Sequence, residues 1–158
     1  MPAALDHVHD LADFVTASPS SYHAAAEGAR RLRAAGFTEQ EESGAWAPGP
    51  GGRYLVRDGA LVAWRVPENA GPRTAFRVVG AHTDSPGFKL KPRPDVGGSG
   101  WQQLGTEVYG GPLLNSWLDR ELGLAGRVVL ADGETRLVRT GALMRIPQLA
   151  IHLDREQN

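Results

Sequence analysis

The sequence predicts an α/β protein, and three patterns along the chain support this. Apolar residues keep a spacing of three to four over residues 1–36, as in helices packed on one face. Residues 51–66 contain two β-like runs around an Asp-Gly pair, which indicates a strand, a tight turn and a strand. A short apolar run over 74–86 then ends on small and polar residues. In α/β sheets, a buried apolar strand is often followed directly by a loop that carries functional residues.

Composition excludes several functional classes. The chain has 158 residues, 41% of them hydrophobic and 22% charged, with a formal net charge of −1. This charge favours neither nucleic acid nor an anionic membrane surface. No apolar run is long enough to span a bilayer, and the first residues lack a secretory pattern. Because cysteine is absent, disulfides and cysteine-based zinc sites are excluded. We expect a cytoplasmic protein without nucleic-acid or membrane partners.

The first 36 residues predict two helices. The Ser-Pro-Ser-Ser stretch at 18–21 ends the first helix and offers caps for the second. The second helix is expected from Tyr22 to Ala35, and Gly36 ends it.

A change of composition after Pro86 predicts a boundary between two lobes. The segment KLKPRPDVGGSG (89–100) is rich in basic residues, proline and glycine. Short β-like runs and turns follow, including a run over 146–153 that passes into a polar tail without a closing element. We therefore expect a first domain over 1–88, a mainly β domain over 89–158, and an incomplete second domain.

The motif GAHTDSPG (80–87) carries the clearest chemical pattern. His82 and Asp84 are two residues apart, and such positions on a strand face the same side. The imidazole is thus a candidate metal ligand, with Asp84 as the carboxylate that orients it. On these residues alone, a hydrogen-bonded loop histidine capped by Asp84 is the more frequent arrangement, so both interpretations stay open.

Three ordered segments resemble the aspartyl aminopeptidase family. They are GAHTDSPG (80–87), GWQQLGTEVYGGPLLNSWLDRELGLAGRV (100–128) and RIPQLAIHLDREQN (145–158), and SSYHAAA near residue 22 fits the family's N-terminal helix. Together the matches cover essentially the whole chain.

This resemblance implies part of a two-zinc exopeptidase catalytic domain of α/β type, interrupted by a β-rich assembly lobe. Residues 1–88 would be the N-terminal part of the peptidase domain, and residues 89–158 the start of the β-rich oligomerisation domain. His82 would bind one of two Zn²⁺ ions per subunit of the complete enzyme, and Asp84 would support that ligand. His152 would reach a neighbouring subunit's active site and stabilise the reacting carbonyl. On the residues alone, His152 is a half-buried strand histidine.

The function implied is zinc-dependent removal of N-terminal, preferably acidic, residues from peptide substrates by a homo-oligomer. A two-zinc site needs several ligands and a general base, and the resemblance places the remaining ligands and the catalytic Glu beyond His152. We therefore expect this chain to be inactive alone. The alternatives are a non-catalytic truncated chain or oligomerisation module, and a two-zinc exopeptidase of different specificity.

Other conspicuous residues have structural explanations. We expect Trp101, Tyr109 and Trp117 to be core or interface aromatics. Asp119 and Arg120 are expected to form an ion pair that fixes a turn or an interface.

Overall fold

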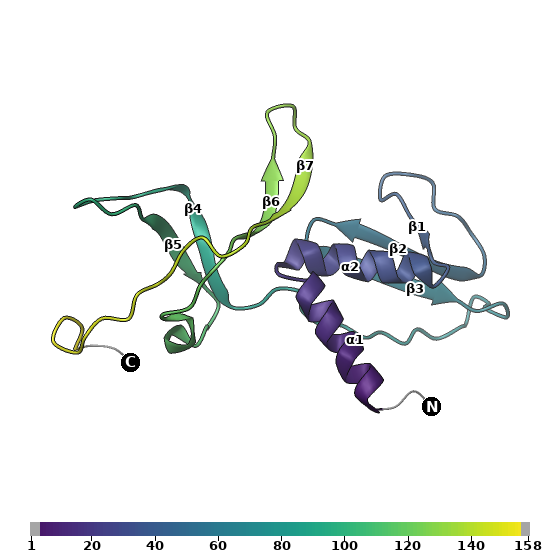
Figure 1. Ribbon diagram of the computed structural model, residues 1–158. Helices are drawn as coiled ribbons and strands as arrows, with labels where there is room; N and C mark the ends of the chain where they lie inside the picture. Colours follow the sequence, from purple (N-terminus) through teal and green to yellow (C-terminus); the bar gives the residue numbers. More distant parts are fainter. Residues whose placement is uncertain (1–3, 156–158) are drawn as a thin grey trace. The chain divides into compact units, whose positions relative to one another are not determined.

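The computed structural model describes residues 4–155. The chain divides into two compact units, each formed by two stretches of sequence (Figure 1). Unit 1 consists of Met1–Asp84 and Ala125–Arg139, and unit 2 of Ser85–Leu124 and Thr140–Asn158. Within the described residues, no helix is long and apolar enough to cross a membrane. The domain boundary predicted at residue 88 stays a prediction.

Unit 1 begins with two helices, as the sequence predicts. They are α1 (Ala4–Ala17) and α2 (Ser21–Ala34). Ser20 caps α2, because its side chain accepts a hydrogen bond from the His23 backbone N–H. Gly36 follows α2 with φ +84°, a left-handed conformation that favours glycine and ends the helix.

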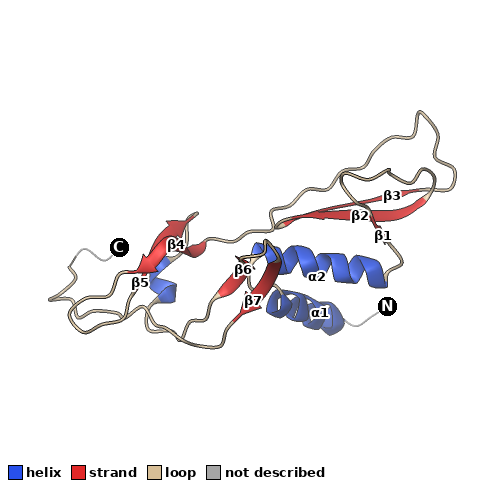
Figure 2. Ribbon diagram, turned by 90° about the horizontal axis from the view of Figure 1, so that it is seen from above, coloured by secondary structure: helices blue, strands red, loops and turns tan. Residues whose placement is uncertain are grey.

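A three-stranded sheet covers α2 on one side (Figure 2). Strands β2 (Gly51–Arg57) and β3 (Ala60–Val66) are antiparallel and joined by the Asp58-Gly59 turn, which confirms the predicted hairpin. The short strand β1 (Thr38–Glu39), which the sequence did not indicate, pairs in parallel with β2. The mixture of helices and sheets agrees with the predicted α/β class.

The core of unit 1 lies between α2 and the sheet. Among the described residues, the buried apolar side chains are Ala25 and Ala29 of α2 and Tyr54 of β2. The Tyr54 hydroxyl donates to Glu39 at 3.1 Å and accepts from the Arg33 guanidinium at 3.1 Å. The buried ring therefore keeps its polar atom paired.

A second hairpin completes unit 1. Strands β6 (Ala125–Val129) and β7 (Thr135–Arg139) pair antiparallel where the sequence indicates short β-like runs and turns, and Gly133 in their turn has φ +87°. The β6 strand contacts α2. This hairpin therefore belongs to unit 1, together with the N-terminal helices.

Unit 2 is built around a two-stranded ribbon. Strand β4 (Gly87–Asp95) pairs antiparallel with β5 (Leu104–Tyr109), and the 3-10 helix η1 (Leu114–Trp117) follows. The first part of the segment 89–100, where the sequence predicts a boundary between lobes, lies in β4. Its two prolines lie where the register shifts, between Leu90 and Asp95. Proline is tolerated at irregular and edge positions, where no ladder hydrogen bond is lost.

Two apolar segments predicted as strands are not strands. Residues 74–85 belong to no helix or strand, and Phe76, Val78 and Val79 are 93%, 88% and 96% exposed. Residues 151–153 form a turn, with Ile151 at 71% exposure. An apolar run indicates what a strand would bury, but a strand also needs a neighbour to pair with.

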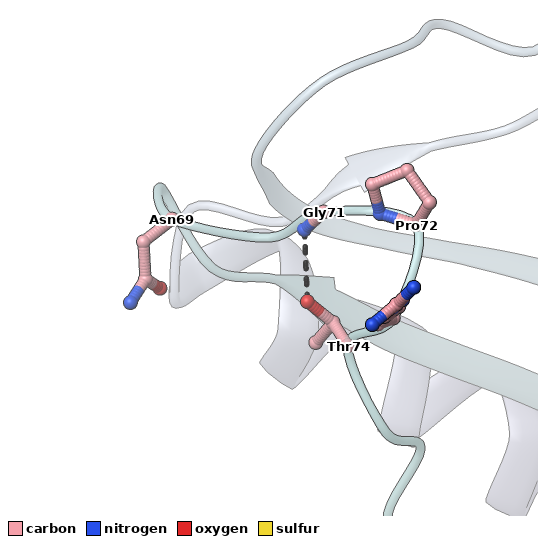
Figure 3. A pocket seen from close by; sticks show the side chains of 5 residues that line it. Asn69, Gly71, Pro72 and Thr74 are labelled. Carbon is pink, nitrogen blue, oxygen red and sulfur yellow. Dashed lines mark hydrogen bonds between the residues drawn. The ribbon is translucent and has the colours of Figure 1, made fainter.

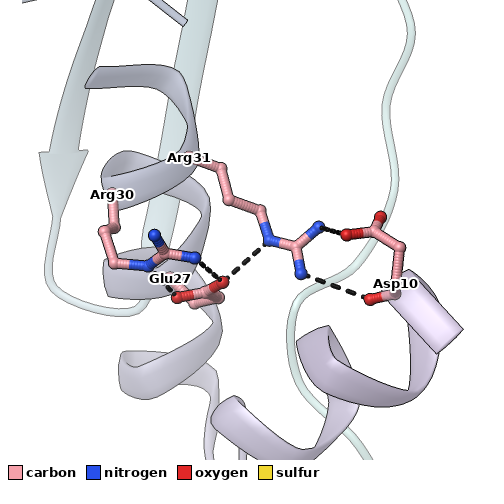
Figure 4. A network of polar contacts seen from close by, with 4 residues as sticks. All are labelled: Asp10, Glu27, Arg30 and Arg31. Atoms are coloured by element: carbon pink, nitrogen blue, oxygen red, sulfur yellow. Dashed lines mark hydrogen bonds and ion pairs between the residues drawn. The ribbon is translucent and has the colours of Figure 1, made fainter. Parts of the chain in front are cut away.

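An ion-pair network joins α1 to α2 (Figure 4). Glu27 accepts hydrogen bonds from Arg30 at 2.6 and 2.7 Å and from Arg31 at 2.7 Å. Arg31 also donates to the Asp10 carboxylate at 2.7 Å. The hydrogen bonds from Arg30 and Arg31 lower the pKa of Glu27 from 4.5 to about 2, against a smaller opposing effect of burial.

We predict that this network gives unit 1 a pH-dependent stability. The folded-state pKa of Glu27 lies below its ordinary value, so its contribution is fully present above pH 4.5 and is lost as pH falls toward about 2. Glu27→Gln should lower the urea midpoint at pH 7, followed by circular dichroism, and flatten its fall below pH 4.5.

Glu42→Gln is the matched control for this prediction. Glu42 pairs with Arg57 at 3.3 Å, and both side chains are more than half exposed, so this pair should add little stability. Equal pH profiles for wild type and Glu27→Gln would contradict the assignment.

Candidate metal-binding segment

His82 and Asp84 lie together in the segment of unit 1 that follows β3. The His82 Nδ1 atom is 2.8 Å from the Asp84 carbonyl oxygen and 3.4 Å from its carboxylate Oδ1. A carbonyl oxygen can only accept a hydrogen bond, so Nδ1 carries the proton in this contact. In the neutral imidazole the lone pair is then on Nε2, which is the atom left for a metal ion.

The residues present fit one ligand of a zinc site. The His82 side chain is 80% exposed, so its ring is accessible to an ion. Within residues 4–155, no group of three or more His, Cys, Asp or Glu side chains is placed to hold a metal ion. Of the described residues, this segment therefore offers at most one ligand, His82, whose Nδ1 is held by the Asp84 carbonyl oxygen.

The segment is anchored to the β2–β3 hairpin. The Thr83 hydroxyl donates to the Gly59 carbonyl oxygen at 2.8 Å. The sequence analysis did not single out Thr83 or the Asp58-Gly59 turn for the site, because the two lie 24 residues apart.

His152 belongs to unit 2 and lies on the surface. Residues 151–153 form a turn, which Leu153 closes with a backbone hydrogen bond to Ala150 at 2.8 Å. The half-buried strand histidine considered from the sequence is therefore wrong. The role of His152 toward a reacting carbonyl stays a prediction.

A shallow hollow lies in the loop after β3 (Figure 3). Asn69, Pro72 and Thr74 line it, and the Gly71 N–H donates to Thr74 Oγ1 at 2.8 Å. That bond closes a local turn.

The other conspicuous residues of unit 2 have varied surroundings. Trp117 packs edge-to-face on Phe88 at 5.3 Å between ring centroids. Trp101 is 73% exposed, so it is not a core residue of the described chain. Asp119 accepts a hydrogen bond from the Gln148 N–H at 3.2 Å. It thereby fixes a turn through a backbone contact.

Curated relatives resemble nearly all of this chain. "Probable M18 family aminopeptidase 2" of Streptomyces avermitilis is 61% identical to this chain over 150 residues. The protein of the same name from Mycobacterium bovis is 46% identical over 149 residues. These alignments cover 94% and 92% of this chain but 35% and 34% of the relatives. The chain thus spans about a third of their length.

Solved structures show the same fold. Yeast aminopeptidase 1 (Ape1) superposes with a TM-score of 0.82 at 29% identity, covering 91% of this chain and 36% of that one. An M18 aminopeptidase of Thermotoga maritima gives 0.81 at 26% identity, covering 97% and 35%.

The family itself follows from these matches. The sequence pattern of "Aminopeptidase I zinc metalloprotease (M18)" matches residues 14–158. That span includes the segment of His82 and Asp84 and the turn that holds His152. This chain belongs to the M18 family of aminopeptidase I zinc metalloproteases.

Proposed function

We propose that this chain contributes to a zinc-dependent aminopeptidase that removes N-terminal, preferably acidic, residues from peptides. The observation that carries the proposal is the His82 imidazole, whose Nδ1 is held by Asp84 at 2.8 Å. It lies inside the stretch matched to a zinc metalloprotease family. When bound, zinc supplies an activated water and polarises the peptide carbonyl.

The residues of this chain have separate tasks in the proposal. His82 binds one of two zinc ions through Nε2, and Asp84 keeps the ring in the required tautomer. His152 serves the active site of a neighbouring subunit by stabilising the reacting carbonyl. A solved relative, described as the mApe1 dodecamer of yeast, is similar to this chain at a TM-score of 0.78 and 29% identity. Its assembly supports a homo-oligomer.

We further propose that the 158-residue chain does not catalyse the reaction by itself. His82 supplies one ligand, whereas a cocatalytic two-zinc site needs several.

A non-catalytic assembly module is the second candidate. Unit 2 has exposed apolar positions that favour it, namely Val108 at 55% and Tyr109 at 41% on β5, and Trp101 at 73% in the connection before that strand. Exposed apolar surface of this kind can mark a protein interface.

We predict a dependence of zinc and activity on His82. The gene product isolated from its natural source should contain two zinc ions per subunit by mass spectrometry, and should release Asp or Glu faster than Leu from fluorogenic substrates. His82→Ala should abolish zinc-dependent hydrolysis and reduce zinc content, because one ligand is lost. His9→Ala, at an exposed position of α1, should change neither.

The 158-residue chain provides the complementary measurement. It should release no amino acid above background. Two bound zinc ions together with aspartate release by this chain would disprove its inactivity, and full zinc occupancy in His82→Ala would disprove the ligand assignment.

We predict a different signature for His152. His152→Ala should lower kcat by about a hundredfold, typical of losing one carbonyl-stabilising donor, while zinc content stays unchanged. Steady-state kinetics with an acidic substrate, paired with metal analysis, measures both effects. Unchanged turnover in this variant would refute the carbonyl role.

A further inference from the structure

The Asp58-Gly59 turn is held from two sides within unit 1. The Asp58 carboxylate pairs with the Arg127 guanidinium of β6. Arg127 also lies over the Tyr22 ring of α2, 4.7 Å from its centroid. Only 31% of the Arg127 side chain is exposed, and a partly covered cation that is paired and stacked holds its partners in place.

The first turn of α2 limits the position of Gly59. A Cβ added at Gly59 would lie 2.9 Å from the Ser21 Oγ and 3.2 Å from the Ser21 Cβ. The hairpin backbone therefore approaches the helix as closely as glycine permits. Asp58 has φ +54°, a left-handed conformation that Asp tolerates in tight turns.

The Gly59 carbonyl oxygen is the acceptor that anchors the His82 segment. Thr83 donates to it at 2.8 Å. Thr83 follows His82 directly, and residues 74–85 lie in no helix or strand. Without a ladder to fix it, the backbone conformation here depends on side-chain contacts. The Nδ1 bond of His82 spans two residues and requires one particular conformation of that backbone.

We propose that Thr83 is a positioning residue, which uses the clamped Asp58-Gly59 turn to hold His82 in the Nδ1–H tautomer. In the neutral ring, Nε2 is then the nitrogen without a proton. The consequence for zinc rests on the proposed function, but the placement of the ring does not. The turn is held by α2 and β6, so the orientation of His82 is set by parts of the chain distant in sequence.

The test is the tautomer of His82 in the zinc-free protein, read from ¹⁵N-labelled histidine by long-range ¹H–¹⁵N NMR. Wild type should show the Nδ1–H form. Thr83→Val keeps the shape and removes the donor, so His82 should shift toward the Nε2–H form that water favours. Amide exchange of residues 81–84 should rise roughly twofold to fivefold, as for one net hydrogen bond.

Three further variants make the result specific. Thr83→Ser keeps a hydroxyl and should restore the wild-type tautomer. Thr74→Val removes a hydroxyl that bonds Gly71 in a separate turn, and His82 should not respond. Gly59→Ala should push the turn from Ser21 and move the acceptor, which reproduces the effect of Thr83→Val.

An unchanged tautomer in both Thr83→Val and Gly59→Ala would overturn the positioning role, as would an equal shift in Thr74→Val. Zinc content of His82→Ala tests the proposed function separately. Retained zinc there, with a tautomer shift in Thr83→Val, would leave Thr83 as a positioning residue while removing His82 as a ligand.

Discussion

The contact between α2 and the hairpin of β2 and β3 supports the rest of unit 1. Tyr54 is fully buried there, and burying such a ring removes roughly 150–250 Å² from water. Its hydroxyl is shared between Arg33 and Glu39, so the burial leaves no polar atom unpaired. Because the hairpin is fixed on the helix at this point, its turn at Asp58 has a defined position. Two other parts of unit 1 bind to this turn. Arg127 of β6 pairs with Asp58, and Thr83 of the His82 segment donates to the Gly59 carbonyl oxygen.

Local sequence signals predicted the elements that local physics determines. The caps around α2 and the Asp-Gly hairpin depend on residues close in sequence, and both are present. The β-like runs and turns expected after residue 100 include β6 and β7, whose pairing was not predicted. The segment at 74–85 and the turn at 151–153 were misjudged. Their apolar residues fit strands, but pairing depends on partners that periodicity cannot reveal.

The candidate site also contains one contact that the sequence indicated and one that it did not. The spacing of His82 and Asp84 suggested their contact, which the structure contains at 2.8 Å, although through the Asp84 carbonyl rather than a strand-face arrangement. The contact of Thr83 with Gly59 joins residues that lie 24 positions apart in the sequence. No sequence pattern indicates it. Side-chain identity therefore indicated the candidate ligand, whereas the element that supports it required three-dimensional placement. The prolines of β4 were read only as part of a lobe boundary, and they occupy an irregular part of a strand.

The exposed run at Phe76, Val78 and Val79 has a consequence in the cell. An exposed apolar segment without secondary structure is open to cleavage by proteases and to binding by chaperones. The lifetime of this polypeptide would then be decided by a competition between covering that run and degrading it. The residues that lead into the candidate zinc ligand would thus also control the abundance of the protein.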